Sequence, residues 1–302
     1  MKIVLLGPDG QVGWELQRAL APLGEVTTLR RESRHADGSP LCGDLAQPEA
    51  LAASLRALRP DVVVNAGAYT AVDKAESEPA LARSINALAP GAVAGVVAEL
   101  GSWLLHFSTD YVFDGSGEQP RNETAATGPL SVYGRTKLEG EDLIRASGCQ
   151  HLILRTSWVY GARGGNFART MLKLALERER LTVIADQIGV PTGADLLADI
   201  TAHALRYALQ RPDVEGTYHA VAQGETSWHG YASHVIAFAR ALGQPIKVQP
   251  EAIEAVPTSA FPTPARRPNN SRMDTHKLRS TFDLALPPWQ AGVERMLTEV
   301  LS

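Results

Sequence analysis

The chain of 302 residues contains only two cysteines, Cys42 and Cys149, and they lie far apart. They match neither the spacing of a metal site nor that of a redox motif. The sequence therefore predicts no metal or redox centre built on cysteine. We expect two buried thiols in a reducing cytosol.

Positive charge and long apolar runs are also lacking. The 29 basic residues are outnumbered by 33 acidic ones, and no basic block is interleaved with aromatic side chains, so we predict no nucleic-acid partner. The apolar stretch at residues 3–6 is too short for a signal-peptide core, and no apolar run approaches the length of a membrane span. We therefore expect a soluble, cytoplasmic protein without a membrane partner.

Short apolar segments alternate with amphipathic helices through the first half of the chain. Strands are expected at residues 2–6, 25–29, 41–45, 61–65, 103–107 and 151–155. This alternation predicts an α/β fold of the Rossmann type, a doubly wound parallel sheet that binds its ligand beyond the carboxyl ends of the strands. We expect a dinucleotide-binding domain at residues 1–155, to which some later segments return. A smaller, interleaved and mainly substrate-binding domain is expected at residues 156–302.

A glycine-rich turn follows the first strand. Gly7, Gly10 and Gly13 have the spacing Gly-x-x-Gly-x-x-Gly, which differs from the commoner Gly-x-Gly-x-x-Gly. Between a strand and a helix, such glycines let the backbone approach a pyrophosphate at the helix N-terminus. A turn without a ligand is the alternative, and the strand-turn-helix context favours a dinucleotide cofactor.

Three further features concern the choice of cofactor. Arg30 and Arg31 end the second strand, where arginine accommodates the 2′-phosphate of NADP and an acidic residue would bind the ribose of NAD. We therefore predict NADPH; NADH stays open, because two arginines can also form a solvated turn. Asp44 is a candidate adenine contact. Gly67 lies in a turn of small residues that either approaches the cofactor or simply packs tightly.

The stretch from residue 107 to residue 137 carries the candidate chemistry. Tyr133 and Lys137 are four residues apart in an expected helix, so both face the same side. A nearby ammonium group lowers the pKa of a phenol toward the range in which it exchanges protons during catalysis. Thr109 follows the preceding strand, where its hydroxyl could share a carbonyl oxygen with Tyr133.

The later part of the chain gives weaker signals. A proline-rich loop at residues 257–268 carries Arg266 and Arg267, which either clamp a phosphate or lie on the surface. Asn86, inside an expected helix, has no assigned role. No ligand cluster has metal spacing, so Mg²⁺ is not predicted. A metal at a subunit contact and a homodimer both stay open, because the amphipathic helix expected at residues 289–301 packs equally well on its own chain.

Together these motifs resemble the extended short-chain dehydrogenase/reductase superfamily. The most specific matching segments are residues 7–14, 65–76, 108–115, 133–137, 155–160, 186–192 and 267–271. The resemblance implies an NADPH-dependent oxidoreductase that reduces the 4-keto group of a dTDP-sugar. Its product would serve the synthesis of cell-surface polysaccharides such as the O antigen of lipopolysaccharide.

By position, the resemblance also implies roles for individual residues. The cofactor would be bound by Gly7, Gly10, Gln11, Val12, Gly13, Arg30, Asp44, Leu45, Ala68, Tyr69, Thr70, Tyr133 and Lys137. Thr109 and Asp110 would meet the sugar, and Trp158 would pack against it. Tyr133 would donate a proton to the sugar oxygen. Some relatives carry an acidic residue in place of Arg30, which leaves the cofactor preference less certain than the fold.

Two other functions stay open. One relative with this fold is a regulatory subunit that modulates methionine adenosyltransferase, so the fold alone does not establish catalysis. The intact set of Thr109, Tyr133 and Lys137 argues against a purely binding role. The second alternative is a reductase, epimerase or dehydratase for another nucleotide sugar. A dehydratase would need an acid and a base beside the tyrosine, whereas here Tyr111 follows Asp110, which favours simple reduction.

Overall fold

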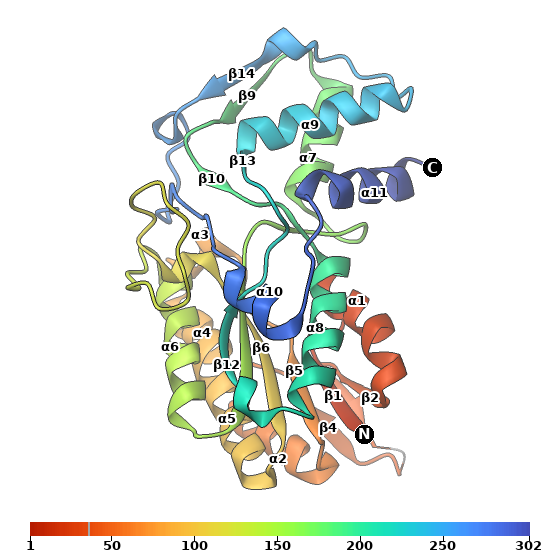
Figure 1. Ribbon diagram of the computed structural model, residues 1–302, viewed down its shortest axis with the longest axis vertical. Helices are drawn as coiled ribbons and strands as arrows, with labels where there is room; N and C mark the ends of the chain where they lie inside the picture. The colour runs from red at the N-terminus through yellow and green to blue at the C-terminus, as the bar shows by residue number, and fades with distance from the viewer. Residues whose placement is uncertain (36) are drawn as a thin grey trace.

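The computed structural model describes residues 1–35 and 37–302. Six parallel strands form its central sheet, in the order β2 (Glu25–Leu29), β1 (Lys2–Leu6), β5 (Val62–Asn65), β6 (Trp103–Thr109), β7 (Gln150–Thr156) and β12 (Gly216–His219). The chain leaves β1 toward both edges, so the sheet is doubly wound as predicted (Figure 1). The carboxyl ends of the strands therefore share one edge of the sheet.

Helices cover both faces of the sheet. One face carries α1 (Gln11–Leu20) and α8 (Ala194–Ala208), and the other carries α2 (Pro48–Leu58), α5 (Ala89–Leu100) and α6 (Val132–Ala146). Successive side chains of β1 alternate between the two: Ile3 and Leu5 join the α1 and α8 side, whereas Val4 and Leu6 join the α2 and α5 side. Burial on both faces explains why the strands read as continuous apolar runs.

One helix, expected at residues 79–100 and found there, is more apolar than we expected. α4 (Pro79–Arg83), a π-helical turn (Ser84–Leu88) and α5 form a continuous helix. The helix has 22 residues, and a stretch of 18 of them has a mean hydropathy of 1.4. By length and composition it could span a membrane, contrary to our expectation that no apolar run approaches that length. Half of its apolar window is buried, and Val93 and Val97 pack in the core against the sheet. This packing accounts for its apolar composition.

The strand expected at residues 41–45 is shorter and lies elsewhere. β4 (Pro40–Cys42) pairs antiparallel with β3 (Glu32–Arg34), outside the parallel sheet. The Asp44 carboxylate accepts a hydrogen bond from the Ala46 amide at 3.0 Å, so the chain turns into α2 instead of extending.

After β7 the chain builds a second group of elements, at the top of Figure 1. Its helices are α7 (Phe167–Glu177), α9 (Trp228–Ala241) and α11 (Trp289–Leu301). Its strands pair as β9 (Leu181–Ile184) with β14 (Ile253–Val256), β10 (Ile188–Gly189) with β13 (Thr226–Ser227), and β8 (Val159–Tyr160) with β11 (Thr192–Gly193). The remaining helices are α3 (Val72–Ala75) after β5 and α10 (His276–Phe282) beside β12. The domain boundary at residue 155 stays a prediction, and α8 and β12 are later segments that pack with the sheet.

Candidate active site

The candidate residues gather where strands of the sheet end. Gly7 follows β1, Thr109 is the last residue of β6, and Trp158 comes two residues after β7. Gly67 comes two residues after β5. Because these strands are parallel, the four positions lie along one edge of the sheet.

The glycine-rich turn is packed too tightly for side chains at its first and last glycines. A Cβ on Gly7, whose φ is +72°, would lie 2.6 Å from the Gly67 Cα atom. A Cβ on Gly13 would lie 2.0 Å from the Gly7 carbonyl oxygen. At Gly10 a Cβ would meet only that same oxygen, at 3.6 Å. Gly10 is the N-cap of α1 and supplies no side-chain cap, so the helix N-terminus is open to an anion such as a pyrophosphate.

Arg30 lies beside this turn. Its Nε is 3.2 Å from the Asp9 carboxylate within the turn, and its Nη1 is 3.3 Å from the Thr28 hydroxyl. The Arg30 side chain is 49% exposed, so its charge can still meet a ligand. Arg31 instead lines an open cavity along β3 and β4. Of the two arginines, Arg30 is therefore the one that contacts the glycine-rich turn.

Four other expected cofactor residues lie around the same edge. Gln11 Oε1 accepts a hydrogen bond from Asn166 at 3.1 Å, which ties α1 to the start of α7. Val12 and Leu45 are partly buried against the core. The Asp44 carboxylate accepts from the Gln47 side chain at 3.2 Å in addition to the Ala46 amide.

The turn after β5 is fixed by a residue to which the sequence assigned no role. Asn86 Oδ1 accepts from the Tyr69 amide at 2.8 Å, and Asn86 Nδ2 donates to the Tyr69 carbonyl at 3.1 Å. Asn86 is 1% exposed and also donates to Thr136 of α6. It therefore holds the expected cofactor residues Ala68, Tyr69 and Thr70 against the helix that carries Tyr133. A lone asparagine in an apolar helix gave no sequence signal for this clamp.

Tyr133 and Thr109 are brought together. The Ser131 hydroxyl caps α6 by accepting from the Gly134 amide at 3.2 Å, and a Cβ on Gly134 would lie 2.3 Å from the Tyr111 carbonyl oxygen. The helix therefore begins directly against the turn that follows Thr109. Burial raises the pKa of Tyr133 to about 12, although the neighbouring Thr109 hydroxyl acts in the opposite direction.

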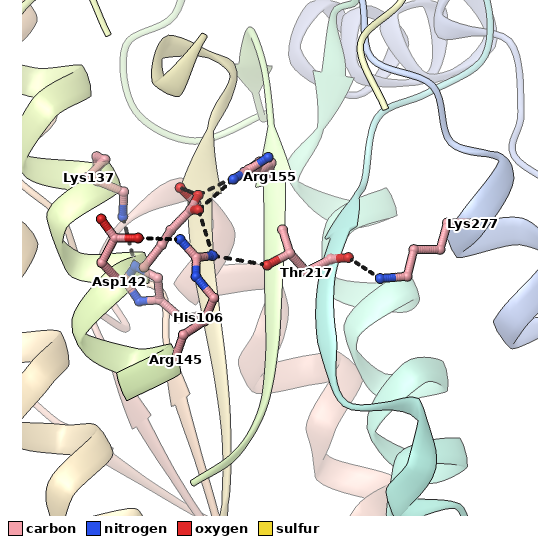
Figure 2. Close-up of polar contacts among 9 residues, drawn as sticks. His106, Lys137, Asp142, Arg145, Arg155, Thr217 and Lys277 are labelled. Carbon is pink, nitrogen blue, oxygen red and sulfur yellow. Dashed lines mark hydrogen bonds and ion pairs between the residues drawn. The ribbon is translucent and has the colours of Figure 1, made fainter. Parts of the chain in front are cut away.

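Lys137 shares the Tyr133 face of α6 but contacts other groups. Its Nζ donates to the Phe107 carbonyl at 2.6 Å and lies 3.0 Å from Nε2 of His106 (Figure 2). Burial lowers the pKa of Lys137 to about 8. The causes of the Tyr133 shift are burial, Thr109 and Asp110, so the structure does not show the lowering of the tyrosine pKa by Lys137 that we expected.

Asp110 is buried beside Thr109 and is reached by a segment from the far end of the sequence. Its Oδ1 accepts from the Thr109 hydroxyl at 3.0 Å, and its Oδ2 accepts from the Ser271 hydroxyl. Burial raises the pKa of Asp110 to about 6, and these two hydrogen bonds oppose the shift. The segment around Ser271 is itself anchored, because the Ser271 amide donates to the Ile188 carbonyl at 2.8 Å.

The two arginines of the proline-rich loop lie in different environments. Arg267 forms an ion pair with Asp73 at 2.7 Å and is half-buried, whereas Arg266 is exposed. The Asp73 carboxylate also accepts from the Ala265 amide at 3.2 Å. The loop is therefore fastened to α3, beside the turn that follows β5.

Trp158 is stacked, with its backbone in the left-handed region. Its φ is +46°, and its ring lies 3.6 Å from the Trp228 ring with an interplanar angle of 13°. A Cβ on Gly189 would come within 2.7 Å of the Trp158 indole, so only glycine allows this position of the ring. Trp228 also lines a cavity of about 310 Å³ together with Gln187, Phe261 and Arg267.

A buried ion pair lies beneath the carboxyl ends of β6 and β7. Arg155 of β7 donates two hydrogen bonds to Glu141 of α6, at 2.9 and 2.7 Å. Ser108, next to Thr109, donates to the same carboxylate at 2.5 Å. Arg145 binds Glu141 from the more exposed side (Figure 2). Within residues 1–35 and 37–302, no group of three His, Cys, Asp or Glu side chains is arranged to hold a metal ion.

Known proteins resemble this chain over its whole length. The family model described as RmlD substrate binding domain matches residues 1–302. A dTDP-4-dehydrorhamnose reductase of Escherichia coli K12 is 55% identical, covering 100% of this chain and 99% of the relative. The crystal structure of a dTDP-4-dehydrorhamnose reductase from Clostridium acetobutylicum superposes with a TM-score of 0.85 at 32% identity, covering 100% of both chains. A Bacillus anthracis reductase of that name, solved in complex with NADP, has a TM-score of 0.85 at 31% identity and 99% coverage of both chains.

Proposed function

The chain belongs to the RmlD substrate binding domain family, and on that premise we propose that it reduces dTDP-4-dehydro-L-rhamnose to dTDP-L-rhamnose with NADPH. It is an oxidoreductase of dTDP-rhamnose synthesis, as are its full-length relatives. The observation that carries the chemistry is the buried Tyr133 phenol beside Thr109, the last residue of β6, which itself donates a hydrogen bond to Asp110.

NADPH fits the carboxyl edge of the sheet in this proposal. The open side of Gly10 at the N-terminus of α1 would receive the pyrophosphate. Arg30 would meet the 2′-phosphate, and Asp44 and Leu45 would lie along the adenosine. Residues 68–70, held by Asn86, would line the nicotinamide half together with Tyr133 and Lys137. When bound, the cofactor supplies the hydride. A related structure that contains NADP supports this choice.

Tyr133 is the proton donor in the proposed mechanism. Its raised pKa keeps the phenol protonated at neutral pH, which is the form needed to protonate an alkoxide that develops at C4 of the sugar. Thr109 would bind the same oxygen by turning its single hydroxyl proton from Asp110, to which it donates in this structure, toward the substrate. General acid catalysis of this kind contributes roughly a hundred- to ten-thousandfold in rate.

The sugar nucleotide is placed between the strand ends and the second group of elements. Trp158 would form a platform for the sugar, beside Thr109 and Asp110. Arg266 and Arg267 are the candidates for the diphosphate. Arg267 already neutralises Asp73, so it would also hold the loop in place, while the exposed Arg266 is available to a ligand.

The direct test is NADPH oxidation with dTDP-4-dehydro-L-rhamnose, generated from dTDP-glucose by the preceding enzymes. We expect turnover in the unchanged protein and a loss of roughly a hundredfold or more in Tyr133→Phe. The affinity for NADPH should change little, because only the phenolic oxygen is removed. Near-normal turnover of Tyr133→Phe would remove Tyr133 from the acid role.

Two outcomes would redirect the proposal. Protein that binds NADPH but turns over neither NADPH nor NADH with this sugar would point to another nucleotide sugar or to a regulatory subunit. Turnover with NADH and not NADPH would overturn the role of Arg30. We also propose that the protein works in the cytoplasm, and that residues 1–155 bind the cofactor while residues 156–302 mainly bind the sugar nucleotide.

A further inference from the structure

Two fully buried side chains, Asn65 and His106, connect the turn after β5 to the buried Lys137. Asn65 and His106 are opposite each other in the neighbouring strands β5 and β6. Asn65 Nδ2 lies 3.1 Å from His106 Nδ1, and His106 Nε2 lies 3.0 Å from Lys137 Nζ. Asn65 and His106 are 0% exposed and Lys137 is 2% exposed. The chain of contacts begins at Gly67, whose amide donates to Asn65 Oδ1 at 3.1 Å.

The first hydrogen bond fixes the direction of the others. A backbone N–H can only donate, so the Asn65 atom that faces Gly67 is its oxygen, and its NH₂ group faces His106. His106 Nδ1 must then accept. Burial lowers the pKa of His106 well below its usual value, so the ring is neutral and carries its single proton on Nε2. That proton faces Lys137 Nζ, which can accept it only through the lone pair of an uncharged amine.

A charged lysine requires the opposite arrangement. An ammonium group has no lone pair, so His106 Nε2 would have to accept and Nδ1 would carry the proton. The Asn65 amide would then have to turn over to offer its oxygen to His106. Its NH₂ group would face the Gly67 amide, and the Gly67 hydrogen bond would be lost. The two protonation states of Lys137 are thus incompatible with one hydrogen-bond pattern.

We propose that Asn65 and His106 are positioning residues that couple the protonation of Lys137 to the backbone of Gly67. Gly67 packs against Gly7 of the glycine-rich turn, so the coupling links Lys137 to the expected cofactor cradle. An acceptor that takes the Gly67 N–H would release Asn65 and favour the charged lysine, whereas an intact Gly67 hydrogen bond favours the amine. This inference concerns Lys137 itself and holds whichever sugar the enzyme reduces.

Other charges around α6 do not replace this coupling. Glu141, one turn after Lys137, raises the pKa of Lys137, but Glu141 is itself paired with Arg155 of β7 and with Arg145. Tyr133, one turn before, is protonated. Charged residues on α3 and α4 bind elsewhere: Arg83 with Glu139, Asp73 with Arg267, Lys74 with Glu78, and Glu76 after α3 with the Val132 amide.

Nuclear magnetic resonance of the free enzyme tests the coupling without measuring activity. Ring ¹⁵N shifts identify the tautomer of His106, side-chain ¹³C shifts follow the ionisation of Lys137, and the amide shift and hydrogen exchange of Gly67 report its hydrogen bond. We expect all three signals to change at one common pH, with the proton of His106 on Nε2 above it and on Nδ1 below it. A fixed tautomer while Lys137 titrates would overturn the proposal.

Asn65→Asp is the variant that separates coupling from structure. A carboxylate has only acceptors, so it can accept from Gly67 and from His106 Nδ1 at the same time. In this variant we expect the pKa of Lys137 to rise by roughly one unit or more. The chemical shift of the Gly67 amide should no longer change with pH. Lys137→Met is the control, in which His106 should keep one tautomer throughout. A Gly67 amide that still titrates in Asn65→Asp, or a His106 tautomer that still switches in Lys137→Met, would contradict the coupling.

Discussion

Ser271 donates a hydrogen bond to the buried Asp110 carboxylate from a position 161 residues later in the sequence. The bond joins the segment after the proline-rich loop to the end of β6, one residue beyond Thr109. It is therefore the point at which the second group of elements reaches the candidate acid–base site.

Because folding raises the pKa of Asp110, we predict that the free energy of unfolding falls as pH rises. In the folded state the pKa of Asp110 is about 6, against 3.8 for an aspartate in water. The protonated form is favoured by folding, so the contribution is fully present below about pH 4 and is lost as pH rises through about 6, a change of roughly 3 kcal/mol. Asp110→Asn should remove this dependence. Urea unfolding of both proteins from pH 4 to pH 8 measures it, and parallel pH profiles would contradict the prediction.

The buried pair of Glu141 and Arg155 predicts a large penalty for removing one charge. Burial alone would raise the pKa of Glu141, but the hydrogen bonds and charge of Arg155 hold it below its usual value. Glu141→Gln leaves a buried guanidinium without its counter-ion, so we expect a loss of about 3–5 kcal/mol in the free energy of unfolding at pH 7. Asp142→Asn, which removes only the exposed partner of Arg145, should cost at most about 1 kcal/mol. Equal losses of unfolding free energy in the two variants would contradict this interpretation.

Arg30 is expected to distinguish NADPH from NADH. Removing a charged hydrogen bond to the 2′-phosphate should weaken the binding of NADPH by about 1.5–3 kcal/mol, or roughly 10- to 100-fold in affinity. Arg30→Ala should therefore raise the KM for NADPH and leave that for NADH nearly unchanged. Arg31→Ala is the matched control and should have a small effect on both. If Arg30→Ala lowers the affinity for NADPH and for NADH equally, Arg30 does not bind the 2′-phosphate.

Trp158 is expected to act on the sugar nucleotide more than on the cofactor. Trp158→Ala removes both the proposed platform and the stack on Trp228, so the KM for the sugar nucleotide should rise much more than the KM for NADPH. Trp158→Phe keeps an aromatic ring and should restore most of the affinity. Steady-state kinetics with each substrate varied in turn provide the measurement. A rise in the KM for NADPH as large as that for the sugar would assign Trp158 to the core.

The sheet and most of its helices could be predicted from the sequence, because apolar periodicity and the spacing of glycines are local signals. The strand expected at residues 41–45 is the exception, since Asp44 uses its carboxylate to start a turn. The helix from Pro79 to Leu100 was predicted with its observed bounds, but its apolar character was underestimated.

The partners within the site were much harder to predict. Asn86 and His106 are single polar residues inside apolar segments, and nothing in their sequence neighbourhood indicates whether they face water or a buried partner. The contacts of Asp110 with Ser271 and of Asp73 with Arg267 span most of the chain. Tyr133 and Lys137 were placed correctly on one helix face, but their partners depend on which groups the strands bring beneath that face.

The late position of Ser271 also has a consequence for biosynthesis. Asp110 leaves the ribosome long before residues 267–271, and domains generally fold as the chain emerges. A chain that stops short of residue 267 therefore holds the glycine-rich turn and Tyr133 but leaves Asp110 without Ser271 and Asp73 without Arg267. These two contacts, and with them the completed candidate site, therefore form only after most of the polypeptide has been made.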